Sequence, residues 1–345
     1  MRNIFLLKNY REAFGNKYNA KPHHSGFDKN LTENYFKKNG YNPIFISPAE
    51  INFRNRDFKN ELFLYTSTED TGLLYKSYIE DIVLALSLAG AIVIPSYQFL
   101  HAHHNKVMME FLRDQSKCDD IKNIVSKAFG TFEEFEKYNS FEENQWVIKK
   151  SHGASSLGVY LSRNNNELPK IIKKISYTGT MKELLIEKYR TKKYNEYRPV
   201  SLNRQKFIVQ NFITGLQNDF KMLVFGHRYY VLERPTRKND FRASGSGKAK
   251  YKWSIDANYP DEIFPFAKKV FDSFNVPMIS LDIAFKDKKL YLLEFQFVGF
   301  GNSGQSKANE YFVMDNNNWI IKKDKLELEQ VYVESIVNYI NTNNL

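Results

Sequence analysis

The sequence predicts a mixed α/β (α+β) chain, in which β-hairpins and amphipathic helices are organised in more than one lobe. Residues 146–161 have the pattern of two strands joined by a Gly/Ser-rich loop. Residues 219–234 and 278–296 have the pattern of hairpins, because two apolar runs flank a short polar break in each. The chain has 345 residues, which is enough for one large multi-lobed unit or for two domains.

The remaining elements follow from the spacing of apolar residues. Recurrence every three or four positions predicts helices at 79–88, 105–112, 119–140, 181–190 and 326–340. Short apolar runs predict strands at 62–65 and 91–94. Residues 16–60 are rich in Asn, Lys and aromatic residues and show no clear period, so no element is predicted there.

Composition excludes several classes of protein. The single cysteine, Cys118, rules out an intramolecular disulfide. The apolar run within residues 1–8 is too short for a signal peptide, and the longest apolar stretch, 82–94, is too short to span a bilayer. We therefore expect a cytoplasmic protein without a membrane span. The formal charge is +11, but the lysines are spread along the chain, so nucleic acid is not the expected partner.

The hairpin at 278–296 places two carboxylates opposite each other. Folding it about Lys288 sets Asp282 opposite Glu294, and the two-residue period of a strand puts Gln296 on the same face. Like charges directly opposite each other destabilise a sheet, which indicates a cation between them. Because all three ligand atoms are oxygen, we expect Mg²⁺ or Mn²⁺ rather than zinc. The alternative is a surface hairpin with scattered polar residues.

The Gly/Ser-rich loop indicates an anion site. The strand at 146–150 carries Lys149 near its end, and the loop at 151–158 contains small residues whose backbone N–H groups can surround a phosphate. A lysine at the end of the strand adds a positive charge beside the same anion. The G-x-x-x-x-G-K-[ST] order of a P-loop is missing. Taken alone, the segment also fits a plain hairpin loop.

The hairpin at 219–234 supplies positive charge. Pairing across its two-residue turn sets Asp219 opposite Arg234, with Lys221 on the same face. The basic, Gly/Ser-rich segment 237–248 follows, and such a loop can close over a polyphosphate when the ligand arrives. A solvated charged loop is the alternative for that segment.

These segments, in this order, resemble the ATP-grasp fold over residues 75–310. WVIKKSHGASSLGV resembles the strand, glycine loop and strand that cover the triphosphate. FIVQNFITG resembles the hinge that holds adenine between two lobes, and LDIAF…YLLEFQFVGFG resembles the metal-binding hairpin. NDFRASGSGK resembles the arginine-bearing loop of ligases of the ribosomal-protein-modifying glutamate ligase and glutathione synthetase type. Gln296 stands where that family usually has asparagine.

The resemblance implies a division of the chain. Residues 1–105 would form an N-terminal α/β domain of the kind that precedes ATP-grasp domains, and residues 106–310 the ATP-grasp domain. Within it, 106–215 would be the small lobe with the phosphate lid, and 216–310 the large lobe with the metal site. Residues 311–345 would form a C-terminal helical segment.

The resemblance also implies roles for single residues. The residues expected to contact ATP are Lys106, Lys149, Ser151, Ser155, Ser156, Gly158, Gln210, Asn211, Phe212, Ile213, Asp219 and Lys221. Those expected to act on the transferred phosphoryl group or the acyl-phosphate are Arg242, Lys221 and Arg234. The expected metal ligands are Asp282, Glu294 and Gln296.

The activity that the resemblance implies is Mg²⁺- and ATP-dependent formation of an amide bond through an acyl-phosphate. The partners would be a carboxylate on a small molecule, peptide or sugar, and an amine co-substrate. The basic composition favours an acidic substrate, such as a uronate or a glutamate-type carboxylate. Two alternatives stay open: a phosphotransferase of the same fold that acts on a hydroxyl, and a non-catalytic nucleotide-binding protein.

Overall fold

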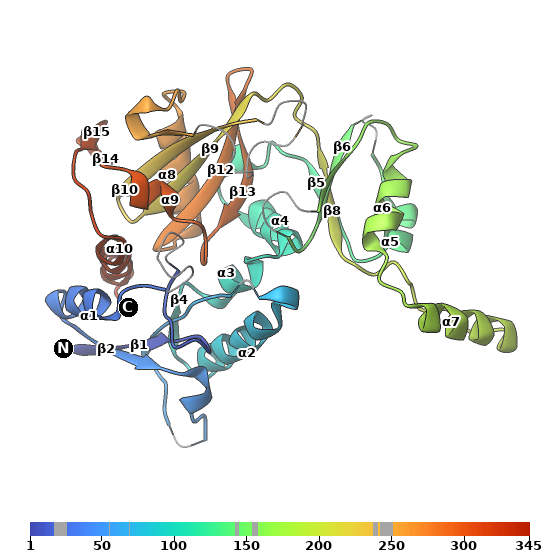
Figure 1. Ribbon diagram of the computed structural model, residues 1–345, viewed down its shortest axis with the longest axis horizontal. Coiled ribbons are helices and arrows are strands. Elements are labelled where there is room, and N and C mark those ends of the chain that lie inside the picture. The colour runs from blue at the N-terminus through green and yellow to red at the C-terminus, as the bar shows by residue number, and fades with distance from the viewer. Residues whose placement is uncertain are drawn as a thin grey trace.

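The computed structural model of the chain describes residues 1–16, 26–54, 56–68, 70–141, 145–153, 158–236, 241 and 251–345. These residues form three β-sheets, each covered by helices (Figure 1). Three of the predicted site residues, Ser155, Ser156 and Arg242, lie outside the described residues.

The N-terminal sheet is parallel and has the strand order β2-β1-β3-β4. Its strands are β1 (Arg2–Leu7), β2 (Tyr41–Ile46), β3 (Leu62–Leu64) and β4 (Ile92–Ile94). The helical elements of this part are α1 (Lys29–Lys38), η1 (Pro48–Glu50), η2 (Thr71–Leu73), α2 (Leu74–Leu88) and α3 (Tyr97–Ala102). In β1, Ile4 packs in one core and Phe5 in another. Because a strand buried on both faces shows no alternation, its sequence lacks the usual strand signal.

The small-lobe sheet is antiparallel and has the order β5-β8-β6-β7. Its strands are β5 (Ser126–Phe129), β6 (Trp146–Lys150), β7 (Val159–Ser162) and β8 (Phe207–Asn211). Helices α5 (Phe132–Tyr138) and α6 (Leu168–Ser176) pack on it through an aromatic and aliphatic core that includes Phe135, Phe207 and Ile172.

The prediction of a helix over residues 119–140 is wrong for the middle of this stretch. The chain forms a short η3 turn (Asp119–Ile121), then strand β5, and only then helix α5. The apolar residues of this stretch face two different cores, Ile121 that of the large lobe and Phe129 that of the small lobe. The helical spacing was therefore produced by two separate cores rather than by one helix face.

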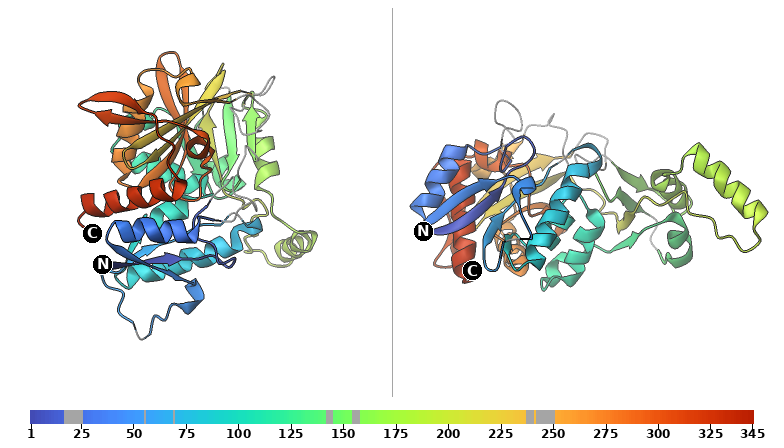
Figure 2. Two further views of the ribbon diagram at one scale, coloured as in Figure 1. Left: turned by 60° about the vertical axis from the view of Figure 1, so that its left-hand side comes forward. Right: turned by 90° about the horizontal axis from the view of Figure 1, so that it is seen from below.

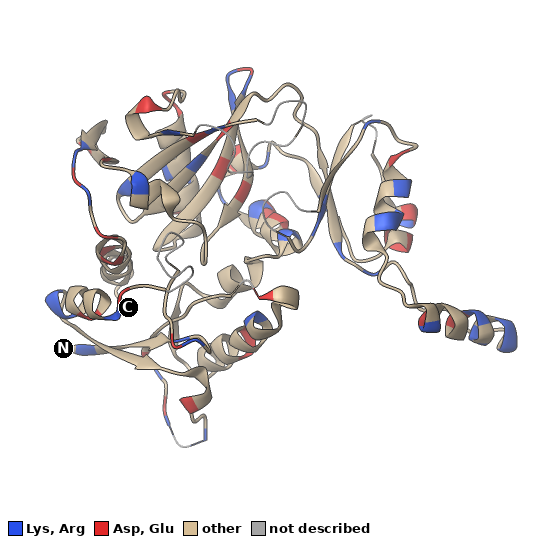
Figure 3. Cartoon of the chain, in the orientation of Figure 1, with Lys and Arg blue, Asp and Glu red and all other residues tan. Residues whose placement is uncertain are grey.

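Helix α7 (Met181–Lys193) projects from the small lobe into solvent (Figures 1 and 2). Its start is fixed by a capping box between Thr180 and Glu183. Arg and Lys residues are spread over the whole molecule and also mark the last turn of α7 (Figure 3).

The large-lobe sheet has the order β13-β12-β9-β10-β14-β15, with β11 beside β10. Its strands are β9 (Asn218–Phe225), β10 (Arg228–Pro235), β11 (Lys252–Trp253), β12 (Met278–Lys286), β13 (Lys289–Gln296), β14 (Tyr311–Asp315) and β15 (Asn318–Lys322). The helical elements around it are α4 (Lys106–Gln115), η4 (Ser254–Asp256), α8 (Ile263–Phe274), α9 (Ser303–Lys307) and α10 (Leu328–Thr342).

Both faces of the large-lobe sheet are buried. Phe220, Met222 and Val224 of β9 face α8 and α4, while Leu223 and Phe225 face α10. The same core contains residues of β1 and α1, so α10 lies between the large lobe and the N-terminal sheet (Figure 2). This packing fixes the N-terminal sheet against the large lobe.

The C-terminal part differs from the expected helical segment. Residues 311–322 form β14 and β15 at one edge of the large-lobe sheet, and helix begins only at Leu328. The turn between the strands contains Asn316 and Asn317, both with positive φ, as a tight hairpin requires. Among the described residues, no helix combines the length and apolar character needed to cross a bilayer.

Candidate active site

A row of charged side chains crosses three neighbouring strands of the large lobe. Asp282 on β12 pairs with Glu294 on β13 and with Lys221 on β9. Directly paired residues of a sheet point to the same face, so the three side chains lie side by side. The predicted pairing of Asp282 with Glu294 is confirmed.

The turn that produces this pairing differs from the predicted one. Asp287 and Lys288 form a two-residue turn, and both have the positive φ of a type I′ turn, 51° and 59°. This turn alone would leave the register one residue short. A β-bulge at Leu293 inserts the missing residue and brings Glu294 opposite Asp282.

Cations surround Asp282. Its carboxylate forms ion pairs with Arg234, whose Nη2 lies at 2.9 Å, and with Lys221, whose Nζ lies at 3.4 Å. Arg234 also donates to both carboxylate oxygens of Asp219, at 2.8 and 2.7 Å, as its predicted cross-strand pairing requires. Burial opposes ionisation of Asp282, but Arg234 and Lys221 outweigh it and lower the pKa of Asp282 to about 2. The carboxylate is therefore charged at neutral pH.

Glu294 is held by the first residue of α4. Lys106 Nζ lies 3.2 Å from Glu294 Oε1 and donates to the carbonyl oxygen of Gly153 at 3.0 Å. Burial opposes ionisation of Glu294, but Lys106 and Lys149 outweigh it and lower its pKa. Burial also lowers the pKa of Lys149. Lys106 of helix α4 and Lys149 of strand β6 thus both stabilise the charge of the Glu294 carboxylate.

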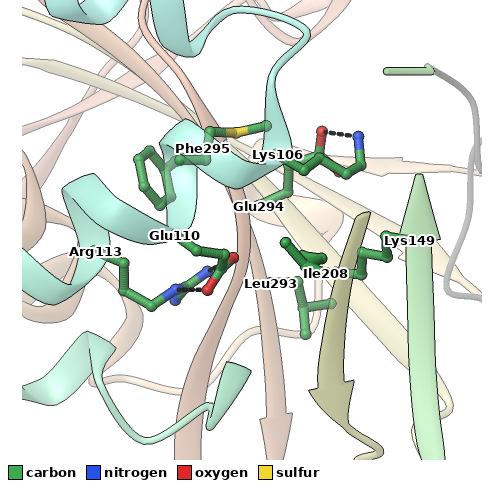
Figure 4. A pocket seen from close by; sticks show the side chains of 9 residues that line it. Lys106, Glu110, Arg113, Lys149, Ile208, Leu293, Glu294 and Phe295 are labelled. Atoms are coloured by element: carbon green, nitrogen blue, oxygen red, sulfur yellow. Dashed lines mark hydrogen bonds and ion pairs between the residues drawn. The ribbon is translucent and has the colours of Figure 1, made fainter. Parts of the chain in front are cut away.

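A small pocket opens where the two lobes meet (Figure 4). It is lined by Lys106, Met109, Glu110, Arg113, Lys149, Ile208, Leu293, Glu294 and Phe295. Ile208 comes from the small-lobe sheet and Leu293 from the large-lobe sheet, so each lobe supplies an apolar wall. The charged groups Lys106, Lys149 and Glu294 line the same pocket.

The sequence analysis did not identify Glu110 and Arg113. Both are almost fully buried on α4, and Arg113 Nε donates to Glu110 Oε2 at 3.0 Å. Arg113 Nη1 also donates to the carbonyl oxygens of Ile121, at 3.0 Å, and Leu292, at 2.7 Å. Leu292 directly precedes the bulge, so Arg113 supports the register that aligns the carboxylates. The only sequence signal was the i, i+3 spacing of opposite charges on a helix.

The described ends of the Gly/Ser-rich loop are tightly fixed. Ser151 is fully buried, and its hydroxyl donates to Asn105 Oδ1 at 3.0 Å. Gly158 has φ +82°, and a Cβ there would lie 3.2 Å from Lys150 Cβ. Because the Ser151 hydroxyl already has a partner within the protein, its contribution to an anion site would come from its position rather than its side chain.

The hinge residues differ in how freely their side chains can bind a ligand. Gln210 is 3% exposed, and its amide nitrogen makes no hydrogen bond to the described residues. It faces the same side of β8 as Ile208, which lines the pocket. Asn211 instead accepts a hydrogen bond from the backbone N–H of Val125 at 2.9 Å. Phe212 contacts Phe241 edge-on with ring centroids 6.0 Å apart, and Ile213 is half-buried.

The residues present fit a hard cation. Asp282 and Glu294 are paired across two strands, and both are charged although they repel each other. Gln296 lies one side-chain repeat farther along the same face of β13 and is half-buried. No group of three His, Cys, Asp or Glu in the described part of the chain forms a metal centre by itself. Two carboxylates and an amide leave coordination positions for water and phosphate, as Mg²⁺ prefers.

Comparisons with known proteins identify the fold. No family model matches the chain, and no curated protein matches it in sequence. Many solved structures match the chain, and three of those that match almost its whole length illustrate the likeness. D-cycloserine synthetase DcsG has a TM-score of 0.55 at 8% identity, covering 97% of this chain and 98% of that one. The macrocyclase MdnC from Microcystis aeruginosa MRC, bound with precursor peptide MdnA, has a TM-score of 0.51 at 10% identity. That match covers 97% of this chain and 99% of the other.

The third structure is the ATP-grasp ligase PsnB, complexed with a phosphomimetic variant of a minimal precursor, Mg and ADP. Its TM-score is 0.50 at 9% identity, and the match covers 98% of this chain and 99% of that one. At such low identity the likeness extends to the fold alone.

Proposed function

We propose that the chain, which has the ATP-grasp fold, is an ATP-dependent ligase that joins a carboxylate to an amine. The observation that carries this proposal is the pocket between the two lobes. There, Glu294 of the large lobe, which is paired with Asp282 on the neighbouring strand, meets Lys106 of α4 and Lys149 of the small lobe. These are the charges that a metal–polyphosphate complex requires on a binding surface.

ATP would bind with its base between Ile208 and Leu293 and its phosphates toward the two lysines. The buried amide of Gln210 faces the same side of β8 as Ile208, and its nitrogen is available to donate to the base. The structure of PsnB with Mg and ADP supports this assignment by analogy of fold. The proposed nucleotide unit is residues 106–310, with the lobes dividing near residue 215 and residues 1–105 as the preceding domain.

Asp282, Glu294 and Gln296 would hold Mg²⁺ or Mn²⁺. Bound there, the cation would neutralise charge on the β- and γ-phosphates as the bond between them breaks. Lys221 and Arg234 keep Asp282 ionised and oriented. Arg234 is already engaged by two carboxylates, so we assign it a positioning role, whereas Lys221, which is less buried, can turn toward a phosphate.

The reaction would proceed in two transfers. A substrate carboxylate oxygen attacks the γ-phosphorus, and the bond from this phosphorus to the β-phosphate oxygen breaks. ADP departs, and the substrate becomes an acyl-phosphate. The amine nitrogen then attacks the acyl carbon, phosphate leaves with the bonding electrons, and the amine proton passes to solvent. Positioning and electrostatics supply most of the catalysis, so no side-chain nucleophile is needed. Arg242 and the segment containing Ser155 and Ser156 would close over the phosphates, and the enzyme would work in the cytoplasm.

The test is ADP release from Mg-ATP in the presence of a panel of carboxylates, with and without hydroxylamine. Hydroxylamine traps an acyl-phosphate as a hydroxamate, so its formation with one acid identifies carboxylate activation. Glu294→Gln should abolish the reaction. Asp315→Asn changes an exposed carboxylate at the end of β14 in the same sheet and should leave it intact.

Each outcome separates the alternatives. ADP release with a stable phosphorylated product and no hydroxamate would select a phosphotransferase that acts on a hydroxyl. Nucleotide binding that depends on Glu294, without turnover on any substrate, would select a non-catalytic nucleotide-binding protein. Failure to bind Mg-ATP at all would refute the assignment of the pocket.

A further inference from the structure

A groove crosses one end of the large lobe, where the turn between β9 and β10 meets the last turns of α8 and of α10. Its volume is about 450 Å³, which is in the range of sites that bind small molecules. The residues that line it, and their neighbours along the chain, all fall within the described ranges. It is called the α10 groove below.

The α10 groove is separate from the proposed nucleotide site. Lys221 of the charged row and Gly226 of the groove lie on or beside the same strand, β9, five residues apart. An extended strand covers about 17 Å in that distance. No described residue lines both the groove and the pocket between the lobes. A ligand in the groove would therefore not touch the nucleotide.

Hydrogen bonds within the protein join the walls of the α10 groove. The backbone N–H of Gly226 donates to the carbonyl oxygen of Pro277 at 3.0 Å, which joins the β9–β10 turn to the segment after α8. Asn275, directly after α8, donates from Nδ2 to Asn343 Oδ1 at 2.8 Å, which joins α8 to the end of α10. Asn343 Nδ2 in turn donates to the carbonyl oxygen of Tyr339 at 2.9 Å. These contacts fix the shape of the groove.

The described lining of the α10 groove is neutral overall. Lys268 and Asp272 are its only described side chains of fixed charge, and they pair with each other at 2.5 Å. Partial burial and the charge of Arg228 lower the pKa of His227, so its imidazole is neutral at pH 7. An ionic ligand would lose water in this groove without finding an unpaired opposite charge among these residues.

Neutral polar groups in the lining are left available for a ligand. Tyr229 is 3% exposed, and its hydroxyl makes no hydrogen bond to a described residue. The same holds for the side-chain amide of Asn338 and the hydroxyl of Tyr339, within the described part of the chain. Burial raises the pKa of both tyrosines, so both hydroxyls keep the proton that they donate. Each of the three groups can both donate and accept a hydrogen bond.

Two aromatic rings add apolar surface to the same lining. Phe271 packs against the core that contains α8, and Tyr339 packs against the core that contains α10. Both rings are half-buried and line the groove. The face of an aromatic ring carries partial negative charge, so it attracts weakly positive C–H groups. The lining thus combines ring faces with neutral groups that form hydrogen bonds.

We propose that the α10 groove binds a neutral saccharide. A saccharide hydroxyl both donates and accepts a hydrogen bond, as the groups of Tyr229, Asn338 and Tyr339 do, and the C–H face of a sugar ring matches the ring of Phe271. A purely apolar ligand would bury these polar groups without partners, which costs binding free energy for each one. The site is additional to the proposed ligase site and does not depend on it.

Titration of the full chain, followed by ligand-observed nuclear magnetic resonance, tests the class of ligand. The probes are D-glucose, D-galactose and D-mannose, each with its uronate and its 2-amino derivative. The derivatives keep the sugar ring and add a negative or a positive charge. A hexose that fits should bind with a Kd of about 2 mM, as expected for a ligand of this size. Its charged derivatives should bind at least about tenfold more weakly, because their charge loses water without gaining a partner.

Matched variants locate the site. Asn338→Ala removes an amide that lines the groove, and Asn341→Ala removes an exposed amide of the same helix that does not line it. The first should weaken hexose binding about fivefold, which corresponds to one hydrogen bond, and the second should leave it unchanged. Tyr339→Phe removes only a hydroxyl from the lining and should weaken binding by a similar factor.

Three results would overturn the proposal. The first is that no hexose of the panel binds at concentrations well above the expected Kd. The second is a charged derivative that binds as tightly as its hexose and is weakened equally by Asn338→Ala. The third is hexose binding that Asn338→Ala and Asn341→Ala affect to the same extent.

The saccharide site and the ligase site are distinguished by one further variant. Glu294→Gln should abolish hydroxamate formation and leave hexose binding unchanged, because Glu294 lines only the pocket between the lobes. Loss of hexose binding in this variant would place the sugar in the nucleotide cleft and overturn the assignment of the α10 groove.

Discussion

Asp282→Asn tests the charged row of the large lobe most directly. The change keeps the shape of the side chain and removes its charge. In the protein without metal, the carboxylate has Arg234 Nη2 at 2.9 Å and Lys221 Nζ at 3.4 Å. In the asparagine variant, Lys221 loses its carboxylate partner on β12, and Arg234 keeps only Asp219.

The size of the effect follows from the pKa. The gap between the ordinary value of 3.8 and the folded value of about 2 corresponds to about 2.4 kcal/mol of stability at neutral pH. The Asp282 side chain is 24% exposed, so solvent screening reduces this to about 1–2 kcal/mol. A carboxyl group with a lowered pKa stabilises the fold above its unfolded pKa, and this contribution is lost as pH falls from about 4 to about 2.

Urea unfolding of the metal-free protein measures this effect. At about pH 7, Asp282→Asn should lower the free energy of unfolding by about 1–2 kcal/mol, and the difference from the wild type should shrink below about pH 4. With Mg-ATP and a substrate acid, the same variant should lose at least about 100-fold in ADP release, because a metal ligand is gone. Asp315→Asn is the control for both measurements. Equal stability at pH 7 together with undiminished Mg²⁺-dependent activity would refute the reasoning.

Three further predictions concern residues around the pocket. Because burial lowers the pKa of Lys149, affinity for Mg-ADP should begin to fall at a lower pH than that at which an ordinary lysine loses its proton, and Lys149→Arg should flatten that profile in a calorimetric titration. Arg113→Lys should destabilise the protein by about 3 kcal/mol in urea unfolding, because Glu110 and two backbone carbonyls lose hydrogen bonds in a buried site. Gln296→Leu should weaken Mg²⁺ binding about tenfold or more, whereas Gln296→Asn, which keeps the amide oxygen, should stay within about threefold. An unchanged Mg²⁺ titration for the leucine variant would exclude Gln296 as a ligand.

Local pairing patterns were readable from the sequence because they depend on neighbours along the chain. The hairpin at 219–234 has its turn and register where alternation and a two-residue loop put them. The facing of Asp282 and Glu294 was also predicted, although the turn was placed differently. Two features, a tighter turn and a bulge at Leu293, cancel in the register. The prediction of the pair therefore succeeded while the prediction of the turn did not.

Predictions failed where the burial pattern depends on distant parts of the chain. The stretch 119–140 contains apolar residues that belong to two cores, and its strand β5 forms only because β8, far along the chain, pairs with it. Strand β1 is buried on both faces by α2 and α10, which a sequence without alternation cannot reveal.

The sequence by itself determined the hairpins, the paired carboxylates and the position of Lys149 near the end of its strand, because strand alternation and turn chemistry are local. Only the tertiary structure brought Lys106 to Glu294, 188 residues apart, and used Arg113 to hold the carbonyl beside the bulge. It alone also formed the α10 groove, which combines residues of the β9–β10 turn, α8 and α10. Contacts of this kind depend on how sheets and helices pack, and side-chain packing has no period along the chain from which it could be predicted.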